Sequence, residues 1–462
     1  MKVALFVHCF FPAHFYGTET YTLELARNLR DLGHEPVVVT AVFPGEPVQD
    51  ALVHAYRHED IEVVSVDKNR IPDTRVKDTY LQPLMAPVLG EVLDRVAPDI
   101  VHVTHLINHT AVLLDVVAQR RLPVVATFTD FFGFCYNNRL EAVDGSLCAG
   151  PANPAVNCLS CHLMAAAQSR SLTRRDRILA TPAGARLGAA LMAVEQRLPG
   201  RRRSAHAGLV QDLFQRPGIL RSLYANYDAA IAPTAFLREA YERNGVGSGM
   251  TTIRFGVDID RRPKPPRPPD APLTLGFIGQ LAPHKGPDIL IEAARRALAG
   301  VPHRVVIHGS EQQAPDYSAR LREASEGAPV EFRGTFSPDK MRVVLDEMDF
   351  LVIPSRWYEN SPLVLLNALA SHTPVIVSDV LGMTEFVISG ENGFVFARGS
   401  VDALAECLSG LAAAGARRHG MELTTHYDLS TQRMTEETIR VYERAISKAG
   451  RVSELSATAS GA

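Results

Sequence analysis

The sequence predicts an α/β protein built from two doubly wound domains that face each other across a cleft. Three observations lead to this fold class. Short apolar runs alternate with helical stretches, the alternation stops at a proline-rich segment at 261–272, and it then restarts. A chain of 462 residues is also long enough for two large α/β domains. Because alternating strands and helices build parallel sheets covered on both faces, each half is expected to be Rossmann-like.

The first half contains six continuous apolar runs that are typical of buried parallel strands. They are KVALFVH (2–8), EPVVVTA (35–41), IEVVSV (61–66), DIVHVT (99–104), LPVVATF (122–128) and DAAIAP (228–233). After the first run, an amphipathic helix places Tyr21, Leu25, Leu29 and Leu32 on one face. Strand, loop and helix account for this whole stretch, so we do not interpret its apolar start as a signal peptide.

The second half repeats the pattern after the linker. Its strand-like runs are LTLGFIG (273–279), RVVIHG (304–309), PVEFRG (329–334), DFLVIPS (349–355) and TPVIVSD (373–379). The linker holds six prolines in twelve residues, which excludes a helix or a central strand. We therefore expect a first domain at 1–260, a linker at 261–272, a second domain at 273–420, helices at 421–448 and a disordered tail at 449–462.

The composition is that of an ordinary soluble enzyme, with 46% hydrophobic and 21% charged residues and a net charge of −3. This balance does not favour nucleic acid as a partner. No apolar run reaches the roughly 18 residues that a membrane-spanning helix needs. We expect a cytoplasmic protein, in which the six cysteines are thiols or metal ligands rather than disulfides.

Residues 131–222 interrupt the alternation, and we interpret them as an insertion into the first domain. They contain four of the six cysteines. From His162 to Ser222 there are 11 arginines, no lysine and 3 acidic residues, a net charge of +8, which leaves about −11 on the rest of the chain.

The stretch RWYENSPLVLLNALA (356–370) joins a polar loop to a very apolar helix. Ser361 followed by Pro362 predicts a helix start, because the hydroxyl can cap free N–H groups and the proline ring suits the first turn. A buried strand, a tight loop and a buried helix place unpaired N–H groups at the carboxyl edge of a sheet, where phosphates bind. Asn367 would then lie on this helix and point to the core or to a ligand.

Four motifs occur in order along the chain: IRFGVD (253–258), GQLAPHKG (279–286), PSRWYENSPLVLLNALA (354–370) and GMTEFV with GENGFVF (382–396). Together they resemble family 4 of the retaining glycosyltransferases, over roughly residues 1–130 and 225–445. The resemblance implies the two-domain GT-B fold and the transfer of a sugar from a nucleotide-sugar donor.

In that family two glutamates, separated by seven residues, contact the transferred sugar and the ribose, and backbone amides at the helix start hold the distal phosphate. Glu359 matches the sugar position, and Asn367 stands where the ribose glutamate is expected. An amide oxygen still accepts from a ribose hydroxyl, although without a charge; the alternative is a polar residue satisfied within a helix core. The amides expected on phosphate belong to Ser361, Pro362, Leu363 and Val364, with the proline contributing position rather than a donor.

Lys285 opens a helix six residues after Gly279. A cation there would stabilise the charge that builds on a departing diphosphate; the alternative is a surface lysine near a helix start. The resemblance pairs this lysine with an arginine five residues earlier, but that position is Gln280 here. We consider Arg356 a candidate for the missing charge.

In the first domain the resemblance points to the loop after the first strand. Gly17 and Thr18, followed by Glu19, match a segment whose backbone approaches donor phosphate and acceptor, although one glycine of the usual pair is Tyr16. Where many members carry His-Asp, this chain has Thr129 and Asp130. Asp130 is then either an acceptor-binding carboxylate or a helix cap. His102 and His105 end a neighbouring strand and are expected to point at the cleft, but a lone histidine at a strand end is more often structural, so the predicted site does not include them.

The resemblance implies a front-side reaction in which the leaving phosphate helps to deprotonate the acceptor, so no protein nucleophile and no catalytic cofactor are expected. Asp258 and Asp260 form one Asp-x-Asp pair, a spacing that can hold a divalent metal. Because it runs into the proline-rich linker, we interpret it as a loop feature.

The remaining cysteines suggest a separate site. The spacing is C-x12-C-x9-C-x2-C in a loop rich in glycine, proline and asparagine, and it predicts a structural zinc ion on four thiolates: Cys135, Cys148, Cys158 and Cys161. An iron–sulfur cluster, a redox thiol pair and unligated cysteines are the alternatives. The arginine-rich segment 162–222, with the helical stretch LGAALMAVEQRL (187–198), suits peripheral contact with the anionic inner face of a membrane, or else a solvated face or a subunit contact.

The sequence thus leads us to expect a retaining glycosyltransferase. It would move a sugar from a UDP- or GDP-type donor to a carbohydrate or lipid-linked acceptor in polysaccharide, glycolipid or cell-envelope biosynthesis. The departures Thr129, Gln280 and Asn367 motivate the alternative of a degenerate nucleotide-sugar-binding or regulatory protein. A dinucleotide oxidoreductase is excluded, because no GxGxxG follows a predicted strand.

Overall fold

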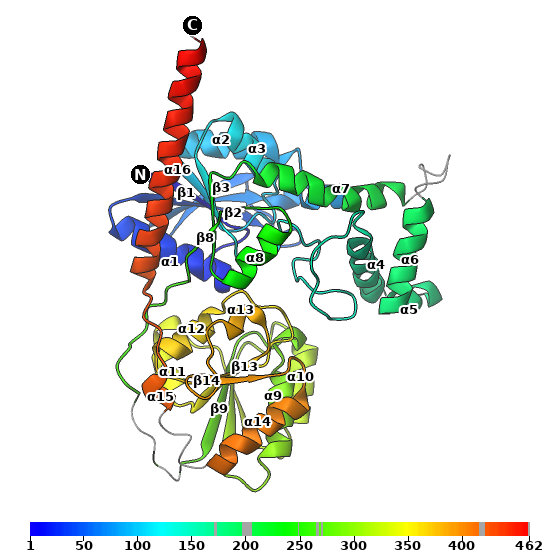
Figure 1. The fold of residues 1–462 in the computed structure, drawn as a ribbon, viewed down its shortest axis with the longest axis vertical. Coiled ribbons are helices and arrows are strands. Elements are labelled where there is room, and N and C mark those ends of the chain that lie inside the picture. The colour runs from blue at the N-terminus through cyan, green and yellow to red at the C-terminus, as the bar shows by residue number, and fades with distance from the viewer. Residues whose placement is uncertain are drawn as a thin grey trace. The chain divides into compact units, whose positions relative to one another are not determined.

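The computed structural model describes residues 1–170, 173–195, 206–247, 249–264, 268, 271–414 and 421–460. The chain divides into two compact units (Figure 1). The first comprises Met1–Ile253 with Gln432–Ala462, and the second comprises Arg254–Thr431. Each unit is an α/β body around a parallel sheet, as the fold class predicted.

The first unit has an eight-stranded sheet in the order β3-β4-β2-β1-β5-β6-β7-β8. Its strands pair in parallel except for the antiparallel pair β3 and β4. The strands are β1 (Lys2–Phe6), β2 (Glu35–Val42), β3 (Val53–His58), β4 (Ile61–Asp67), β5 (Ile100–Val103), β6 (Val124–Thr127), β7 (Ala229–Ala232) and β8 (Thr251–Thr252).

Helices cover this sheet, and the insertion forms a group of its own. Figure 1 shows α4, α5 and α6 gathered to one side of the sheet, with α7 leading back toward it. The helices of the unit are α1 (Gly17–Asp31), α2 (Met85–Val96), α3 (Val112–Gln119), α4 (Val156–Arg170), α5 (Arg174–Leu179), α6 (Pro182–Glu195), α7 (Ala207–Tyr224), α8 (Ala235–Arg243) and α16 (Thr431–Ser460), with the 3-10 turns η1 (Lys68–Arg70) and η2 (Val76–Thr79).

The second unit has a six-stranded parallel sheet in the order β11-β10-β9-β12-β13-β14. Its strands are β9 (Leu273–Ile278), β10 (His303–His308), β11 (Val330–Gly334), β12 (Phe350–Ile353), β13 (Val375–Ser378) and β14 (Gly393–Phe396). Its helices are α9 (Pro287–Ala297), α10 (Pro315–Ala324), α11 (Met341–Asp346), α12 (Leu363–Ala370), α13 (Leu381–Thr384), α14 (Val401–Ala414) and α15 (Met421–Thr424), with η4 (Pro283–Lys285) and η5 (Pro338–Lys340).

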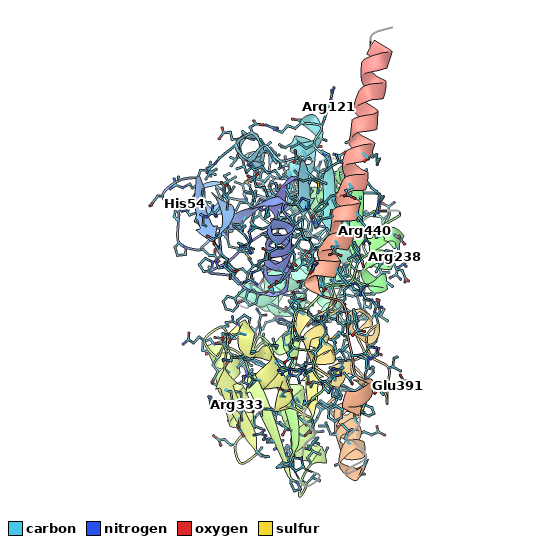
Figure 2. The ribbon with its side chains drawn as sticks, turned by 90° about the vertical axis from the view of Figure 1, so that its left-hand side faces the viewer. His54, Arg121, Arg238, Arg333, Glu391 and Arg440 are labelled. Carbon is cyan, nitrogen blue, oxygen red and sulfur yellow. The ribbon has the colours of Figure 1, made fainter. Side chains whose placement is uncertain are left out.

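The core of the second unit lies where the sheet meets α9 and α14. Leu275, Phe277 and Val352 of the sheet are buried there with Leu290 of α9 and Leu404 of α14. Continuous apolar strands are needed because helices cover both faces of the sheet. Polar side chains lie on the edge strands of both sheets. Figure 2 labels Arg333 on the edge strand β11, where it pairs with glutamates. It also labels the exposed His54 on the edge strand β3 of the first unit.

The eleven predicted strand runs are all strands in the structure. Three strands lie outside the predicted runs: β3, β8 and β14. Leu32 was wrongly placed on the buried face of α1, since it follows the last helical residue and is 38% exposed. The disordered tail expected at 449–462 stays a prediction; the helix α16 is drawn from Thr431 to Ser460.

Candidate functional site

The switch point of the second sheet gathers the predicted donor residues. The chain builds β9, β10 and β11 outward on one side and then returns to place β12 on the other side of β9. The carboxyl ends of β9 and β12 therefore flank the crevice where doubly wound sheets bind ligands. The segment after β9 carries Lys285, and the segment after β12 carries Glu359.

Lys285 and Glu359 meet at this edge although 74 residues separate them. Lys285 Nζ lies 2.7 Å from Glu359 Oε1, and the two side chains are 27% and 14% exposed. The Ser355 hydroxyl donates to the same carboxylate oxygen at 2.8 Å. Burial by itself would raise the pKa of Glu359, but the Lys285 ammonium and then the Ser355 hydroxyl outweigh it and hold that pKa below its ordinary value.

Close backbone packing fixes the two segments against each other. Gly286 has φ +72°, and a Cβ added there would lie 2.1 Å from the carbonyl oxygen of Pro354. The Arg356 backbone N–H donates to the His284 carbonyl at 2.7 Å, and the rings of His284 and Trp357 stack with centroids 3.8 Å apart. The lysine and the glutamate are thus held by a rigid frame rather than by free loops.

Arg356 and Gln280, the other two side chains expected beside the diphosphate, are placed differently. Arg356 donates from both terminal nitrogens to the Asp288 carboxylate, at 2.8 and 2.7 Å, so its charge is already balanced. Gln280 lies half-buried in the turn after β9, where its backbone carbonyl accepts from the Ala282 N–H. Lys285 therefore stands as the cation next to Glu359, and the structure does not bring Arg356 to it.

The start of α12 differs from the predicted cap. The residue before the helix is Pro362, and Ser361 has φ +81°, a left-handed backbone conformation that turns it away from a capping position. Its hydroxyl is buried and, in the described part of the chain, has no hydrogen-bond partner. The predicted Ser361 cap is therefore wrong. The first helical bonds come from the amides of Leu365 and Leu366 to the Pro362 carbonyl, so those of Leu363 and Val364 precede the helical ladder.

Asn367 lies one turn into α12 and is only partly buried, whereas Leu365, Leu366 and Leu369 are buried. Its side-chain nitrogen donates to the Leu363 carbonyl at 2.9 Å. This bond fixes the orientation of the amide and leaves its oxygen as the atom that can accept from a ligand.

A second polar cluster lies at the switch point of the first sheet, where β1 has β2 on one side and β5 on the other. The predicted Asp130 pairs with His105, whose Nδ1 accepts the Ile107 N–H at 3.1 Å. The carboxylate also accepts from Asn138 Nδ2 at 2.8 Å and from the Phe132 N–H at 3.0 Å. Burial would raise the pKa of Asp130, but the charge and hydrogen bond of His105 hold it below its ordinary value.

The loop after β1 and the first turn of α1 add three more side chains to this cluster. His8 Nε2 and the Cys9 thiol both contact Glu19 Oε1, at 3.2 and 3.0 Å, and the His8 ring lies 4.1 Å from that of His105. Burial and the neighbouring histidines lower the pKa of His8 well below its ordinary value. Glu19 Oε2 is buried without a hydrogen-bond partner in the described residues.

Gly17 and Thr18 form the first turn of α1, directly before Glu19. The cluster of His8, Glu19, His105 and Asp130 was only half found from the sequence, which named Asp130 and noted Glu19. Histidines at the carboxyl ends of adjacent strands, as in VHCF (7–10) and HVTHL (102–106), were the available signal.

Two other expectations are settled by the contacts. His102 does not reach a ligand site: it is fully buried between Thr127 and the Tyr442 hydroxyl of α16, at 2.9 and 2.5 Å. Asp258 and Asp260 do not converge on a metal position. Asp258 accepts from the Thr431 backbone at the start of α16, and Asp260 pairs with Arg262.

The four insertion cysteines line one small cavity. All six cysteines of the chain are free thiols. In the described part of the chain, a different group has ligand atoms within 4.8 Å of one another: His8, Cys9 and Glu19. The sulfurs of the four insertion cysteines are more widely spaced than that.

Comparisons with known families match both halves of the chain. A family model described as "Glycosyltransferase Family 4" matches residues 15–142, and one described as "Glycosyl transferases group 1" matches residues 272–414. Together these stretches cover more than half of the 462 residues. Among the described helices, none combines the length and the apolar character needed to cross a bilayer.

Curated relatives are similar over part of their length. The chain is 32% identical over 180 residues to a "GDP-mannose-dependent alpha-(1-6)-phosphatidylinositol dimannoside mannosyltransferase" of Mycobacterium tuberculosis, covering 37% of this chain and 45% of that protein. It is 29% identical over 249 residues to a "Glycogen synthase" of the same species, covering 51% and 59%. The chain thus spans about half the length of these relatives.

Solved structures share the fold along the whole chain. Sucrose-phosphate synthase from Thermosynechococcus elongatus has a TM-score of 0.58 at 17% identity and covers 99% of both chains. HepE of Anabaena in complex with UDP-glucose has a TM-score of 0.59 at 14% identity, covering 96% of this chain and 99% of that one. At such identities the likeness concerns the fold alone.

Proposed function

The chain belongs to family 4 of the glycosyltransferases, and from that premise we propose that it transfers a sugar from a nucleoside-diphosphate sugar to a hydroxyl acceptor. The observation that carries the proposal is the pairing of Lys285 and Glu359 beside the uncapped start of α12, at the switch point of the second sheet.

We assign the donor to this edge of the second unit. A diphosphate carries negative charge that grows when the bond to the sugar breaks, so the Lys285 ammonium stabilises the leaving group. The free amides at the start of α12 and the unpartnered Ser361 hydroxyl are donors suited to phosphate oxygens. When phosphate attracts Lys285, Glu359 is released to accept hydrogen bonds from the sugar hydroxyls, and the Asn367 oxygen accepts from the ribose.

We further propose that the reaction retains the configuration of the transferred sugar. No step needs a protein nucleophile if the leaving phosphate itself takes the acceptor proton on the face from which it departs. The cluster of His8, Glu19, His105 and Asp130 is the proposed acceptor side, since it presents buried carboxylates and imidazole rings to hydroxyl groups. The donor would be of the UDP or GDP type, in line with the mannosyltransferase relative and the UDP-glucose complex.

The insertion supplies a surface suited to a lipid-linked acceptor. On α5 and α6 four apolar side chains are 53–62% exposed, and they recur at helical spacing: Ile178, Leu187, Leu191 and Val194. Exposed arginines on α5 lie in the same segment: Arg174, Arg175 and Arg177. An apolar stripe beside cationic side chains matches the surface of an anionic bilayer. We therefore place the protein in the cytoplasm, in peripheral contact with the inner face of the membrane, acting in glycolipid, polysaccharide or envelope assembly.

The membrane contact is tested by cosedimentation with vesicles. The wild-type protein should bind vesicles that contain phosphatidylserine and lose most of this binding in the variant Leu187→Ser/Leu191→Ser. Equal binding by both proteins, or none to anionic vesicles, would contradict a bilayer as the partner of this surface.

The transferase proposal is tested with purified protein and a panel of UDP- and GDP-sugars. We expect a thermal shift with one base type and slow donor hydrolysis that follows it. Lys285→Ala should lower turnover on the order of a hundredfold or more. The matched control is Lys340→Ala, because Lys340 is a 63% exposed lysine of the same unit. Proton NMR of the released or transferred sugar reports its configuration; an inverted product would refute retention.

The alternative of a degenerate scaffold rests on Thr129, Gln280 and Asn367, and the same assay separates it. Donor binding without turnover in the wild type, rescued by Asn367→Glu, would favour degeneration. Turnover by the wild type that Asn367→Glu does not increase would favour an active enzyme.

A further inference from the structure

Four cysteines of the insertion converge from separate pieces of the chain, and we propose that they bind a single zinc ion. Cys135 ends a tight turn after β6, where its N–H donates to the Phe131 carbonyl at 2.8 Å. Cys148 ends a small hairpin closed by the bridge between Glu141 and Leu147. The other two lie three residues apart in the first turns of α4: Cys158 and Cys161. All four line the same cavity.

Two of the four sulfurs already have hydrogen-bond donors of the kind that thiolates accept from. The Leu140 N–H points to Cys135 Sγ and the Gly150 N–H to Cys148 Sγ, each at 3.4 Å. Asn157 Nδ2 lies 3.6 Å from Cys148 Sγ as well. Donors around the ligand sulfurs orient them and stabilise their negative charge in metal–thiolate sites.

The size of the cavity and its ligand set indicate what it holds. Its volume is about 10 Å³. That is close to the space of a single water molecule, which suits one metal ion. Four thiolates that close on one ion, with no other donor in the set, select zinc among the common divalent metals.

The insertion also has the kind of core that needs such a link. Among the described residues, a few partly buried side chains pack against its buried apolar cluster, which holds five side chains: Leu159, Ala189, Met192, Val210 and Leu213. So small a core contributes little to stability, and small units with this deficit are held by metals or disulfides. Leu159 directly follows Cys158, so a metal at the cysteines would anchor α4, which packs against α6.

Metal binding should draw the four sulfurs together. In the structure Cys135 Sγ donates to Asn137 Oδ1 at 2.9 Å, and Cys148 Sγ donates to the Gly150 carbonyl at 3.4 Å. These bonds use the thiol protons, which zinc displaces when it binds thiolates. The sulfurs then turn from these oxygens into the cavity.

The metal would also support the proposed acceptor side. Asn138 lies between the first two ligands, and its side-chain oxygen accepts from the Phe131 N–H at 2.7 Å while its nitrogen donates to Asp130 at 2.8 Å. The zinc loop is thus continuous with the residue that holds the Asp130 carboxylate. This part of the inference rests on the proposed function, whereas the metal site itself does not.

The test is elemental analysis of the full-length protein purified without added metal. We expect about one equivalent of zinc per chain in the wild type and a loss of most of it in Cys148→Ser. Cys148 is chosen because it is only partly buried. The control is Cys407→Ser, which removes a partly buried cysteine of α14 outside the cluster and should keep the full zinc content.

If Cys148→Ser does not fold, the wild type still decides the question. Titration with a mercurial thiol reagent should release zinc to a colorimetric indicator in step with four thiols, and replacement by cobalt should give the thiolate charge-transfer absorption of a tetrahedral site. Iron with acid-labile sulfide, disulfides among these cysteines, or metal-free protein with four freely reactive thiols would overturn the proposal. Zinc retained equally by Cys148→Ser and Cys407→Ser would overturn the assignment of Cys148.

Discussion

The pair of Lys285 and Glu359 makes a quantitative prediction about stability that is separate from activity. Replacing the lysine in Lys285→Met keeps most of its apolar stem but leaves the Glu359 carboxylate, 14% exposed, with Ser355 as its hydrogen-bond donor. Breaking a fully buried pair costs about 3–5 kcal/mol, and a surface pair is worth about 0–1 kcal/mol. Because Lys285 is 27% exposed, we expect a loss of about 2 kcal/mol, between these limits.

The measurement is a double-mutant cycle of Lys285→Met, Glu359→Gln and the combination, followed by thermal unfolding. For a unit of this size about 2 kcal/mol corresponds to roughly 4–8 °C in Tm. Glutamine still accepts from Ser355 but carries no charge, so the double variant should recover much of the loss. A coupling energy of about 1–2 kcal/mol is expected.

The pH dependence has a defined sign. The folded pKa of Glu359 lies below its ordinary value, so the pair stabilises the fold above about pH 4.3 and this contribution is lost as the pH falls through the lower folded pKa. Without Lys285 the burial of the carboxyl remains and raises its pKa. The free energy of unfolding of Lys285→Met should therefore lie furthest below that of the wild type at neutral pH. The difference between the two should narrow toward about pH 5.

Two outcomes would refute this reasoning. One is additivity of the two single substitutions, which would mean that the pair is not coupled. The other is a gap that does not change between neutral and mildly acidic pH. Lys340→Met serves as the control, because this 63% exposed lysine should change stability by no more than about 0.5 kcal/mol.

Two further substitutions test the frame of each unit by thermal unfolding. Gly286→Ala should destabilise the second unit by several kcal/mol, and clearly more than the control Gly300→Ala. Both glycines have positive φ (+72° and +77°), but only at Gly286 would a Cβ lie 2.1 Å from the Pro354 carbonyl oxygen. Equal effects would show that the backbone around Gly286 moves to accommodate the Cβ. Tyr442→Phe should lower the stability of the first unit by about 1–3 kcal/mol, because it removes the 2.5 Å bond to the buried His102; an unchanged Tm would mean that this contact does not hold α16.

Much of the fold was predictable because its strands are continuous apolar runs with helices between them. The missed strand β3 lies at the edge, and its sequence VHAYRH alternates apolar, polar and ring side chains that half face solvent. Such a strand has no buried face on either side to mark it. Whether a strand lies at the edge depends on the whole sheet, so a local stretch of sequence does not predict it.

The site was predictable to the extent that it follows from strand ends. Lys285 and Glu359 come after strands that the topology makes neighbours, so a motif in each segment was sufficient to name them. The failure at Ser361 has a local cause: its left-handed backbone conformation is rare for serine and cannot be inferred from a Ser-Pro signal. A lone histidine at a strand end is more often structural, so the sequence does not single out His105. Its partner Asp130 follows a different strand, and only the folded sheet brings the ring and the carboxylate together.

The return of α16 to the first unit affects how the protein is made. Residues from Gln432 onward complete a body whose other part ends at Ile253, so the ribosome must synthesise the entire second unit before the first can close. Until then the His102 surface that Tyr442 covers stays uncovered on the nascent chain. Translation that stops short of α16 should therefore yield a chain whose second lobe is intact while its first is held open to chaperones and proteases.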